Sequence, residues 1–129
     1  MPVDGGAIVA RARALVGVRF RAQGRSAADG LDCIGLVATA LDRGGAPDDY
    51  ALRGGSAARI AAGLRAVGLR AAEGRTPGDV LVMQAGPEQL HLGIWTGAGM
   101  VHADARLRRI VERPGVPAWP VIGTWRLEA

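Results

Sequence analysis

The sequence predicts an α+β fold, because helical patterns fill the first half of the chain and strand patterns fill the second. The change of character falls at the breaker segment Thr76-Pro77-Gly78. A length of 129 residues suits a single domain, which we expect to span residues 1–129. In that domain the N-terminal helices pack on an antiparallel sheet of about five strands.

Three helices are expected, each from apolar periodicity bounded by capping residues. The stretch 18–31 between the first two is expected to be a loop, because its Gly, Ser and Asp residues interrupt any period. The expected helices are 4–16 with Asp4 as N-cap and Gly17 after its end, about Cys33 to Asp42 closed by Gly44-Gly45, and 57–67 between Ser56 and Gly68.

Strands are expected in the second half, where short runs rich in apolar residues follow the breaker segment. The expected strands are 79–83, 90–96, 99–104, 109–113 and 123–127. Two segments stay open: 42–55 is either a lid or a linker, and the proline-rich 114–120 around Trp119 either covers a sheet edge or docks onto a partner.

The charge balance is basic but scattered. All sixteen basic residues are Arg, the net charge is +4 and the pI is about 10.9. Only Arg106, Arg108 and Arg109 form a tight cluster, and no aromatic residues interleave with it. We therefore expect no specific nucleic-acid partner, and at most steering toward an anionic polymer such as a cell envelope.

Targeting signals are also not apparent in the sequence. No basic region leads into an apolar stretch at the N-terminus, and no segment approaches the roughly 20 apolar residues of a membrane span. We expect a soluble chain that is made in the cytoplasm without a signal peptide. It would reach the outside by cell lysis or as part of a particle.

The lone cysteine is the most informative residue of the chain. Cys33 begins an expected helix, and the two histidines of the chain, His91 and His102, lie downstream. A helix start lowers the pKa of a thiol and offers backbone N–H groups to an oxyanion. A cysteine with histidines elsewhere is typical of a nucleophile and its base, although a single cysteine is also commonly a buried apolar residue.

A hairpin is expected to bring the histidines together. With its turn at Gly97-Ala98, Gly93 lies opposite His102, and side-chain alternation places His91 on the same face. The histidines are then diagonal neighbours within ~7 Å, with open space at Gly93. One imidazole would accept the thiol proton and the other would orient it. The simpler alternative is two incidental surface histidines. The opposite face, expected to pack on the core, carries Leu92, Ile94, Val101 and Ala103.

Zinc is the competing use of one cysteine and two histidines. The sequence has no C-x-x-C, no H-E-x-x-H and no close ligand pair on one helix, so we expect no metal.

Several short motifs follow one another in the order of a known family. They are 18–24 with its aromatic residue, Asp32-Cys33-Ile34-Gly35-Leu36-Val37, Pro77-Gly78-Asp79-Val80-Leu81, His91-Leu92-Gly93-Ile94-Trp95, the turn 96–99, and Met100-Val101-His102-Ala103. With these motifs in this order, the sequence resembles the NlpC-type peptidoglycan endopeptidases, which are papain-like cysteine peptidases of bacteria and their phages. The resemblance extends over nearly the whole chain.

The resemblance implies a papain-like domain with Cys33 as nucleophile, His91 as general base and His102 as orienting residue. Its implied substrate is the peptidoglycan stem peptide, usually at the bond between γ-D-Glu and a diamino acid, and no cofactor is needed. The site residues expected near the substrate are Phe20, Asp32, Ile34 and Gly93.

Two of these residues depart from the family pattern. Phe20 stands where many members carry Tyr, and Ile34 replaces a common Ser, which leaves the substrate choice open. Asp32 either contacts a substrate amine or caps the helix. Because the fold also supports acyl transfer and deamidation, a related amidase or acyltransferase is one alternative. A non-catalytic tail-tip or adaptor module is another.

The short D-C-[aliphatic]-G-L-V variant resembles the branch found in phage tails and gene-transfer particles. That resemblance implies local opening of the cell wall by a phage or phage-like particle. It also implies phage-tail-like proteins as partners.

Overall fold

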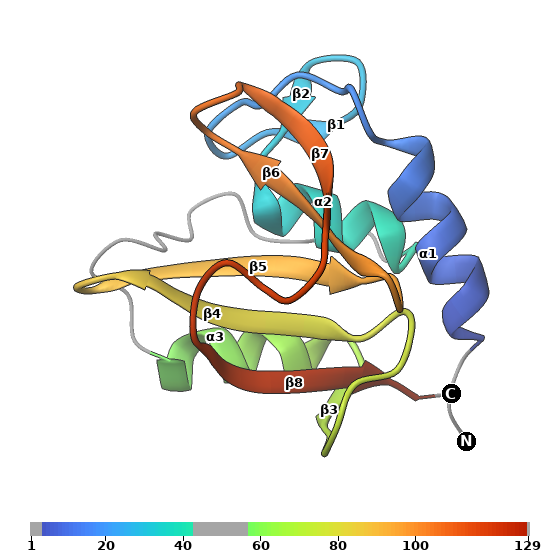
Figure 1. Cartoon of the computed structure of the whole chain (residues 1–129), viewed down its shortest axis with the longest axis vertical. Coiled ribbons are helices and arrows are strands. Elements are labelled where there is room, and N and C mark those ends of the chain that lie inside the picture. Colours follow the sequence, from blue (N-terminus) through green and yellow to red (C-terminus); the bar gives the residue numbers. More distant parts are fainter. Residues whose placement is uncertain (1–3, 43–56, 129) are drawn as a thin grey trace.

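Helices cover one face of an antiparallel sheet in the computed structural model, which describes residues 4–42 and 57–128 (Figure 1). The helices are α1 (Gly5–Ala14), α2 (Cys33–Ala40) and α3 (Ala57–Ala66). The strands are β1 (Arg25–Ser26), β2 (Gly30–Leu31), β3 (Leu69–Ala71), β4 (Val80–Gly86), β5 (Gln89–Trp95), β6 (Gly99–Asp104), β7 (Arg109–Pro114) and β8 (Val121–Leu127). The α+β class is confirmed.

The main sheet has six strands in the order β3-β8-β4-β5-β6-β7, and every neighbouring pair is antiparallel. The expected count of five was therefore wrong by one strand. The missed strand, β3, has three residues, of which only Leu69 is buried, so it carries no alternation for the sequence to reveal. Within 18–31, the short strands β1 and β2 form a separate hairpin that the sequence did not indicate.

The helix ends follow their capping residues. The Asp4 carboxylate accepts the Gly6 N–H at 2.9 Å and starts α1, and Gly17 lies just past the helix with φ 96°. α2 ends at Ala40, two residues before the expected end. Gly44-Gly45, Ser56 and most of the 42–55 segment lie outside the described residues.

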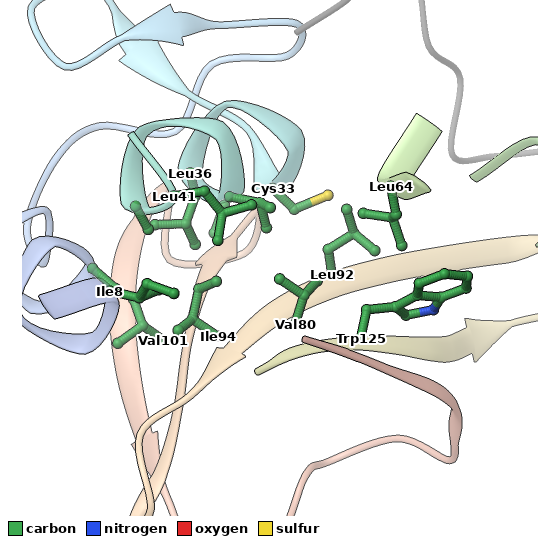
Figure 2. Packing of buried hydrophobic residues seen from close by; sticks show 14 of the residues in the cluster. Ile8, Cys33, Leu36, Leu41, Leu64, Val80, Leu92, Ile94, Val101 and Trp125 are labelled. Atoms are coloured by element: carbon green, nitrogen blue, oxygen red, sulfur yellow. The ribbon is translucent and has the colours of Figure 1, made fainter. Parts of the chain in front are cut away.

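Two clusters of buried side chains lie on opposite faces of the sheet. The main core joins the helices to one face, and includes the expected Leu92, Ile94, Val101 and Ala103 (Figure 2). A smaller cluster on the other face consists of Leu81, Met83 and Met100, with Trp95, Trp119 and Val121 packed against it. We call it the outer cluster.

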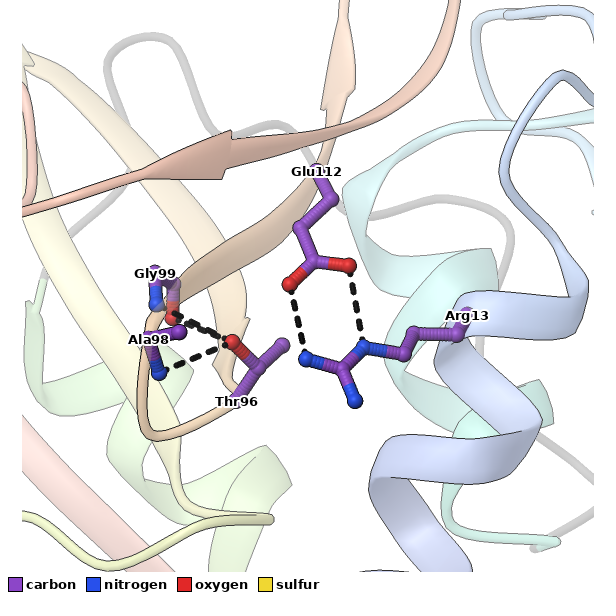
Figure 3. Close-up of polar contacts among 5 residues, drawn as sticks. All are labelled: Arg13, Thr96, Ala98, Gly99 and Glu112. Carbon is purple, nitrogen blue, oxygen red and sulfur yellow. Dashed lines mark hydrogen bonds and ion pairs between the residues drawn. The ribbon is translucent and has the colours of Figure 1, made fainter.

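The β5–β6 turn has the expected register. Thr96 is buried, and its hydroxyl oxygen accepts the N–H groups of Gly99 at 3.0 Å and Ala98 at 3.3 Å (Figure 3). Arg13 of α1 and Glu112 of β7 form a two-pronged ion pair beside this turn, with both N···O distances 3.0 Å. Exposed ion pairs of this kind contribute little to stability, so the turn is set mainly by Thr96.

Beyond the turn, β5 and β6 separate. Their ladder contains only Ile94↔Val101 and Trp95↔Met100, whereas β6 pairs with β7 along its whole length. β6 and β7 therefore diverge together from β5, as Figure 1 shows. His91 on β5 and His102 on β6 border this fork. None of the described helices is long and apolar enough to cross a membrane.

Candidate active site

The two histidines are hydrogen-bonded to each other across the fork. His91 Nε2 lies 2.9 Å from His102 Nδ1, and the ring centroids are 5.1 Å apart with the planes nearly perpendicular. His102 is 1% exposed, and His91 is partly buried. The structure thus brings these residues together on one face of the hairpin, as the register predicted. They are not incidental surface residues.

Burial keeps both imidazoles neutral. The pKa of His91 is lowered to about 4, chiefly by burial and also by the neighbouring His102, while Asp104 opposes the shift. The pKa of His102 is also lowered, again chiefly by burial and slightly by Arg113, with Asp104 opposing. At neutral pH one proton is therefore shared along the Nε2···Nδ1 contact, and His91 Nδ1 is the nitrogen left for another partner.

Cys33 is the first residue of α2, but its thiol lies in the main core. The residue is 3% exposed and belongs to the same buried cluster as Leu92 and Leu64 (Figure 2). The pKa of the thiol is raised to about 12, chiefly by burial and also by Asp32, while the backbone amides of Leu92 and Cys33 and the Arg25 guanidinium oppose the rise. The expected lowering by the helix start was wrong for this state, because desolvation outweighs the helix dipole.

The thiol and the histidine pair meet at Leu92 without direct contact. Leu92 presents its amide to the thiol, and its neighbour His91 projects to the outer face, where its ladder partner Met83 belongs to the outer cluster. Within the described ranges no hydrogen bond joins Cys33 to either histidine. The structure therefore brings two of the three expected catalytic residues into contact, whereas the thiol of the third is buried in the main core.

Asp32 serves the fold. Its Oδ1 accepts the Gly35 N–H at 2.8 Å and pairs with Arg25 at 2.7 Å, while Oδ2 accepts the Gln23 N–H at 3.0 Å. Of the two roles left open for this carboxylate, the structure shows the helix cap. The Asp32 carboxylate is already hydrogen-bonded to Gln23, Arg25 and Gly35, so the expected contact with substrate has no support here.

The other three residues expected near the substrate differ in their surroundings. Phe20 and Ile34 are partly buried and pack against the main core. Gly93 does not leave open space: a Cβ there would lie 2.9 Å from the Met100 sulfur, so that expectation was wrong. The reason is that the thioether of Met100, on the neighbouring strand, fills the position above the glycine.

Trp119 is a site residue that the sequence did not assign. Its ring lies 5.1 Å from that of His91 and 5.8 Å from that of His102, both in edge-to-face arrangement. The proline-rich segment 114–120 was expected to cover a sheet edge or dock onto a partner; here its tryptophan covers the histidines. Only its proline-flanked position marked it in the sequence.

The zinc alternative has no geometric counterpart. In the part of the chain that the structure describes, no three His, Cys, Asp or Glu side chains gather as metal ligands do. Cys33 and the histidines point to different faces of the sheet.

Comparisons with known proteins identify the fold. The chain matches no protein-family model and no curated protein sequence. Among solved structures it is similar to NlpC1 from Trichomonas vaginalis, with a TM-score of 0.69, 20% identity and coverage of 95% of this chain. It is also similar to the NlpC/p60 domain of the peptidoglycan hydrolase SagA, with a TM-score of 0.64, 21% identity and coverage of 95% of this chain. The chain has the NlpC/p60 fold.

The resemblance inferred from the motifs is thus confirmed at the level of the fold. The match takes in 97% of the SagA domain but 44% of the Trichomonas protein, so this chain spans less than half of the latter's length. In the NlpC/p60 fold found here, the lone cysteine opens a helix and both histidines lie on one hairpin.

Proposed function

We propose that this chain is a cysteine peptidase that hydrolyses an amide bond in the peptidoglycan stem peptide, of the type joining γ-D-Glu to a diamino acid. The observation that carries the proposal is the 2.9 Å contact between His91 Nε2 and His102 Nδ1. It gives one imidazole an orienting partner and leaves its Nδ1 for a thiol. The similarity to SagA, described as a peptidoglycan hydrolase, supports the substrate class.

In the proposed reaction, the Cys33 thiol transfers its proton to His91 Nδ1 as the sulfur attacks the scissile carbonyl carbon. The tetrahedral oxyanion is stabilised by first-turn amides of α2, including that of Cys33. The C–N bond then breaks, the imidazolium gives its proton to the leaving amine, and a thioacyl enzyme remains. Water, deprotonated by His91, attacks the thioester and releases the acid and the thiol.

Proton transfer in this scheme is concerted with attack. In the closed structure the pKa of the thiol is about 12 and that of His91 about 4, so the resting pair is uncharged. Opening of the site would hydrate the sulfur, lower the pKa of the thiol and allow contact with His91. A substrate that separates Cys33 from the main core supplies one route to that opening.

One observation favours a second candidate, the non-catalytic adaptor module. Cys33 is 3% exposed and packs in the main core like an apolar side chain. Alkylation by iodoacetamide separates the two candidates. An adaptor thiol reacts slowly at all pH values, whether or not stem peptide is present. A peptidase thiol becomes more reactive when a stem peptide opens the site, and this gain is lost in His91→Ala.

Digestion of purified peptidoglycan tests the proposed activity. Wild-type protein should release fragments with a new α-amine on the diamino acid, identified by mass spectrometry. Cys33→Ala and His91→Ala should lose at least about 1,000-fold in rate, while His102→Gln, which keeps an acceptor for His91, should lose less. Cleavage by Cys33→Ala at the wild-type rate would overturn the proposal.

We further propose that the chain acts from a phage or phage-like particle, with phage-tail-like proteins as partners. The support is the D-C-[aliphatic]-G-L-V segment at 32–37. Detection of the chain in purified particles by immunoblotting would support this, and its absence from them would contradict it.

A further inference from the structure

The connection between β7 and β8 crosses the outer face of the sheet. β7 is an edge strand, whereas β8 lies between β3 and β4. The chain must therefore pass over the intervening strands, and in Figure 1 it runs across β5 before entering β8. Trp119, near the end of this connection, packs on the outer cluster beside Leu81, Met83 and Met100.

The indole closes one side of the histidine pair. It touches both imidazoles edge to face, at centroid distances of 5.1 Å and 5.8 Å. His102 Nε2 is fully buried and has no hydrogen-bond partner within the described residues. An unpaired buried nitrogen of this kind would bind water if water reached it.

The protonation state of His102 decides whether His91 can act as a base. When neutral His102 carries its proton on Nε2, its Nδ1 accepts the Nε2–H of His91, which leaves His91 Nδ1 unprotonated. A protonated His102 has no acceptor: its Nδ1–H would donate to His91 Nε2 and place the His91 proton on Nδ1. Hydration of His102 favours that charged form, because burial is what disfavours it.

We propose that Trp119 is a positioning residue for the histidine pair: its indole excludes water from His102 and holds the two rings so that His91 keeps Nδ1 free for the thiol proton. This assignment rests on the proposed peptidase function and adds a residue to it. Trp119 acts through His102 and His91 and needs no contact with the substrate.

The charged groups near the histidine pair do not belong to the connection that carries Trp119. Asp104, at the end of β6, raises the pKa of His102, and Arg113, in β7, lowers it. Removing the indole leaves those two charges in place. A change in the pKa of the histidines therefore reports the entry of water.

The test uses NMR titration of the two histidines in the full chain, with Trp119→Ala, Trp119→Phe and the control Trp95→Ala. Trp95 packs on the same outer cluster but makes no ring contact with either histidine in the described part of the chain. In Trp119→Ala we expect both histidine pKa values to rise toward 6.5, with kcat for stem-peptide cleavage falling about tenfold or more and KM changing little. Trp119→Phe should restore most of both, and Trp95→Ala should leave the titrations unchanged.

Three outcomes would overturn the assignment: unchanged histidine titrations in Trp119→Ala, equal shifts in Trp95→Ala, or faster cleavage in Trp119→Ala, which would make the connection an inhibitory strap. If Trp119→Ala does not fold, Trp119→Leu removes the ring while keeping a smaller apolar side chain, and shifts of the histidine pKa values in the same direction are expected. The titrations need no substrate, so they test Trp119 even where wild-type protein cleaves no peptidoglycan. Absence of cleavage by wild-type protein would count against the proposed function but not against the role of Trp119.

Discussion

At Cys33 two opposing effects on one thiol can be compared by size. A helix start favours a nearby anion by roughly 0.3–1 kcal/mol at exposed positions. Full burial raises the pKa of an acidic group by up to ~3–5 units, and each unit corresponds to about 1.4 kcal/mol. Burial therefore dominates in the closed site, and the thiol is neutral. The residue type and its helix position were predictable from the sequence; the depth of burial depends on how Leu92 and α3 pack around it.

The lowered pKa of His91 has a consequence for the pH dependence of cleavage. His91 must be neutral to accept the thiol proton, and its pKa of about 4 keeps it neutral well below 6.5. We expect the acid limb of kcat/KM, which reports the free enzyme, to lie between about 4 and 6.5. His102→Gln removes one of the neighbours that lower this pKa, so its acid limb should move upward. An acid limb at or above 6.5 in wild-type protein would contradict the burial described here.

The sequence predicted the histidine contact because strand alternation and a two-residue turn set the register without knowledge of the core. It did not predict Met100 above Gly93 or Trp119 above His102. Both involve side chains that meet only after the strands and the β7–β8 connection have packed. Contacts of that kind carry no periodic signal in the sequence.

At the scale of elements, the first turn of α2 is joined tightly to the loop before it. Asp32 links that turn to Gln23 and Arg25. Gly35 allows the close approach, because a Cβ there would overlap the carbonyl oxygen of Gly24. The spacing of Asp32 and Gly35 is thus a packing requirement, and it fixes where the thiol can lie.

Asp32→Ala should destabilise the protein more than a simple cap deletion. It removes a cap worth about 1 kcal/mol and leaves partly buried donors unpaired, so we expect a loss of about 2–4 kcal/mol in the free energy of unfolding. Asp4→Ala is the matched control, since Asp4 is an exposed N-cap of α1 and should cost only about 1 kcal/mol. Urea denaturation measures both. Equal losses would show that the contacts of Asp32 to the loop contribute nothing.

The strands that the sequence located are the longer ones, each of six or seven residues. β6 was predicted with its observed bounds, and β5 within one residue at each end. β1, β2 and β3 have two or three residues each and owe their strand geometry to pairing with partners elsewhere. No local pattern distinguishes such strands from loop.

For the whole molecule, two buried histidines with lowered pKa values couple stability to pH. Their unfolded pKa is near 6.5, so below that pH the unfolded chain takes up protons that the folded chain refuses: His91 until about pH 4, and His102 until its own lowered pKa. Stability should therefore be fully present above pH 6.5 and fall as pH drops toward 4. The limiting slope is about 1.4 kcal/mol per pH unit for each histidine.

Urea denaturation between pH 4 and pH 7 measures this coupling. The variant His91→Gln/His102→Gln should lose most of the pH dependence between 4.5 and 6.5, since carboxylates with lowered pKa values, such as Asp104 and Glu112, titrate below that window. The same slope in the double variant would show that other groups carry it.

The most direct measurement of the central claim is the intact mass of the protein after brief mixing with a stem peptide and an acid quench. The account predicts a mass increase equal to the acyl fragment, mapped to Cys33, in wild-type protein, and none in Cys33→Ala. Release of cleaved peptide without any acylation of Cys33, or with equal yield from Cys33→Ala, would contradict it.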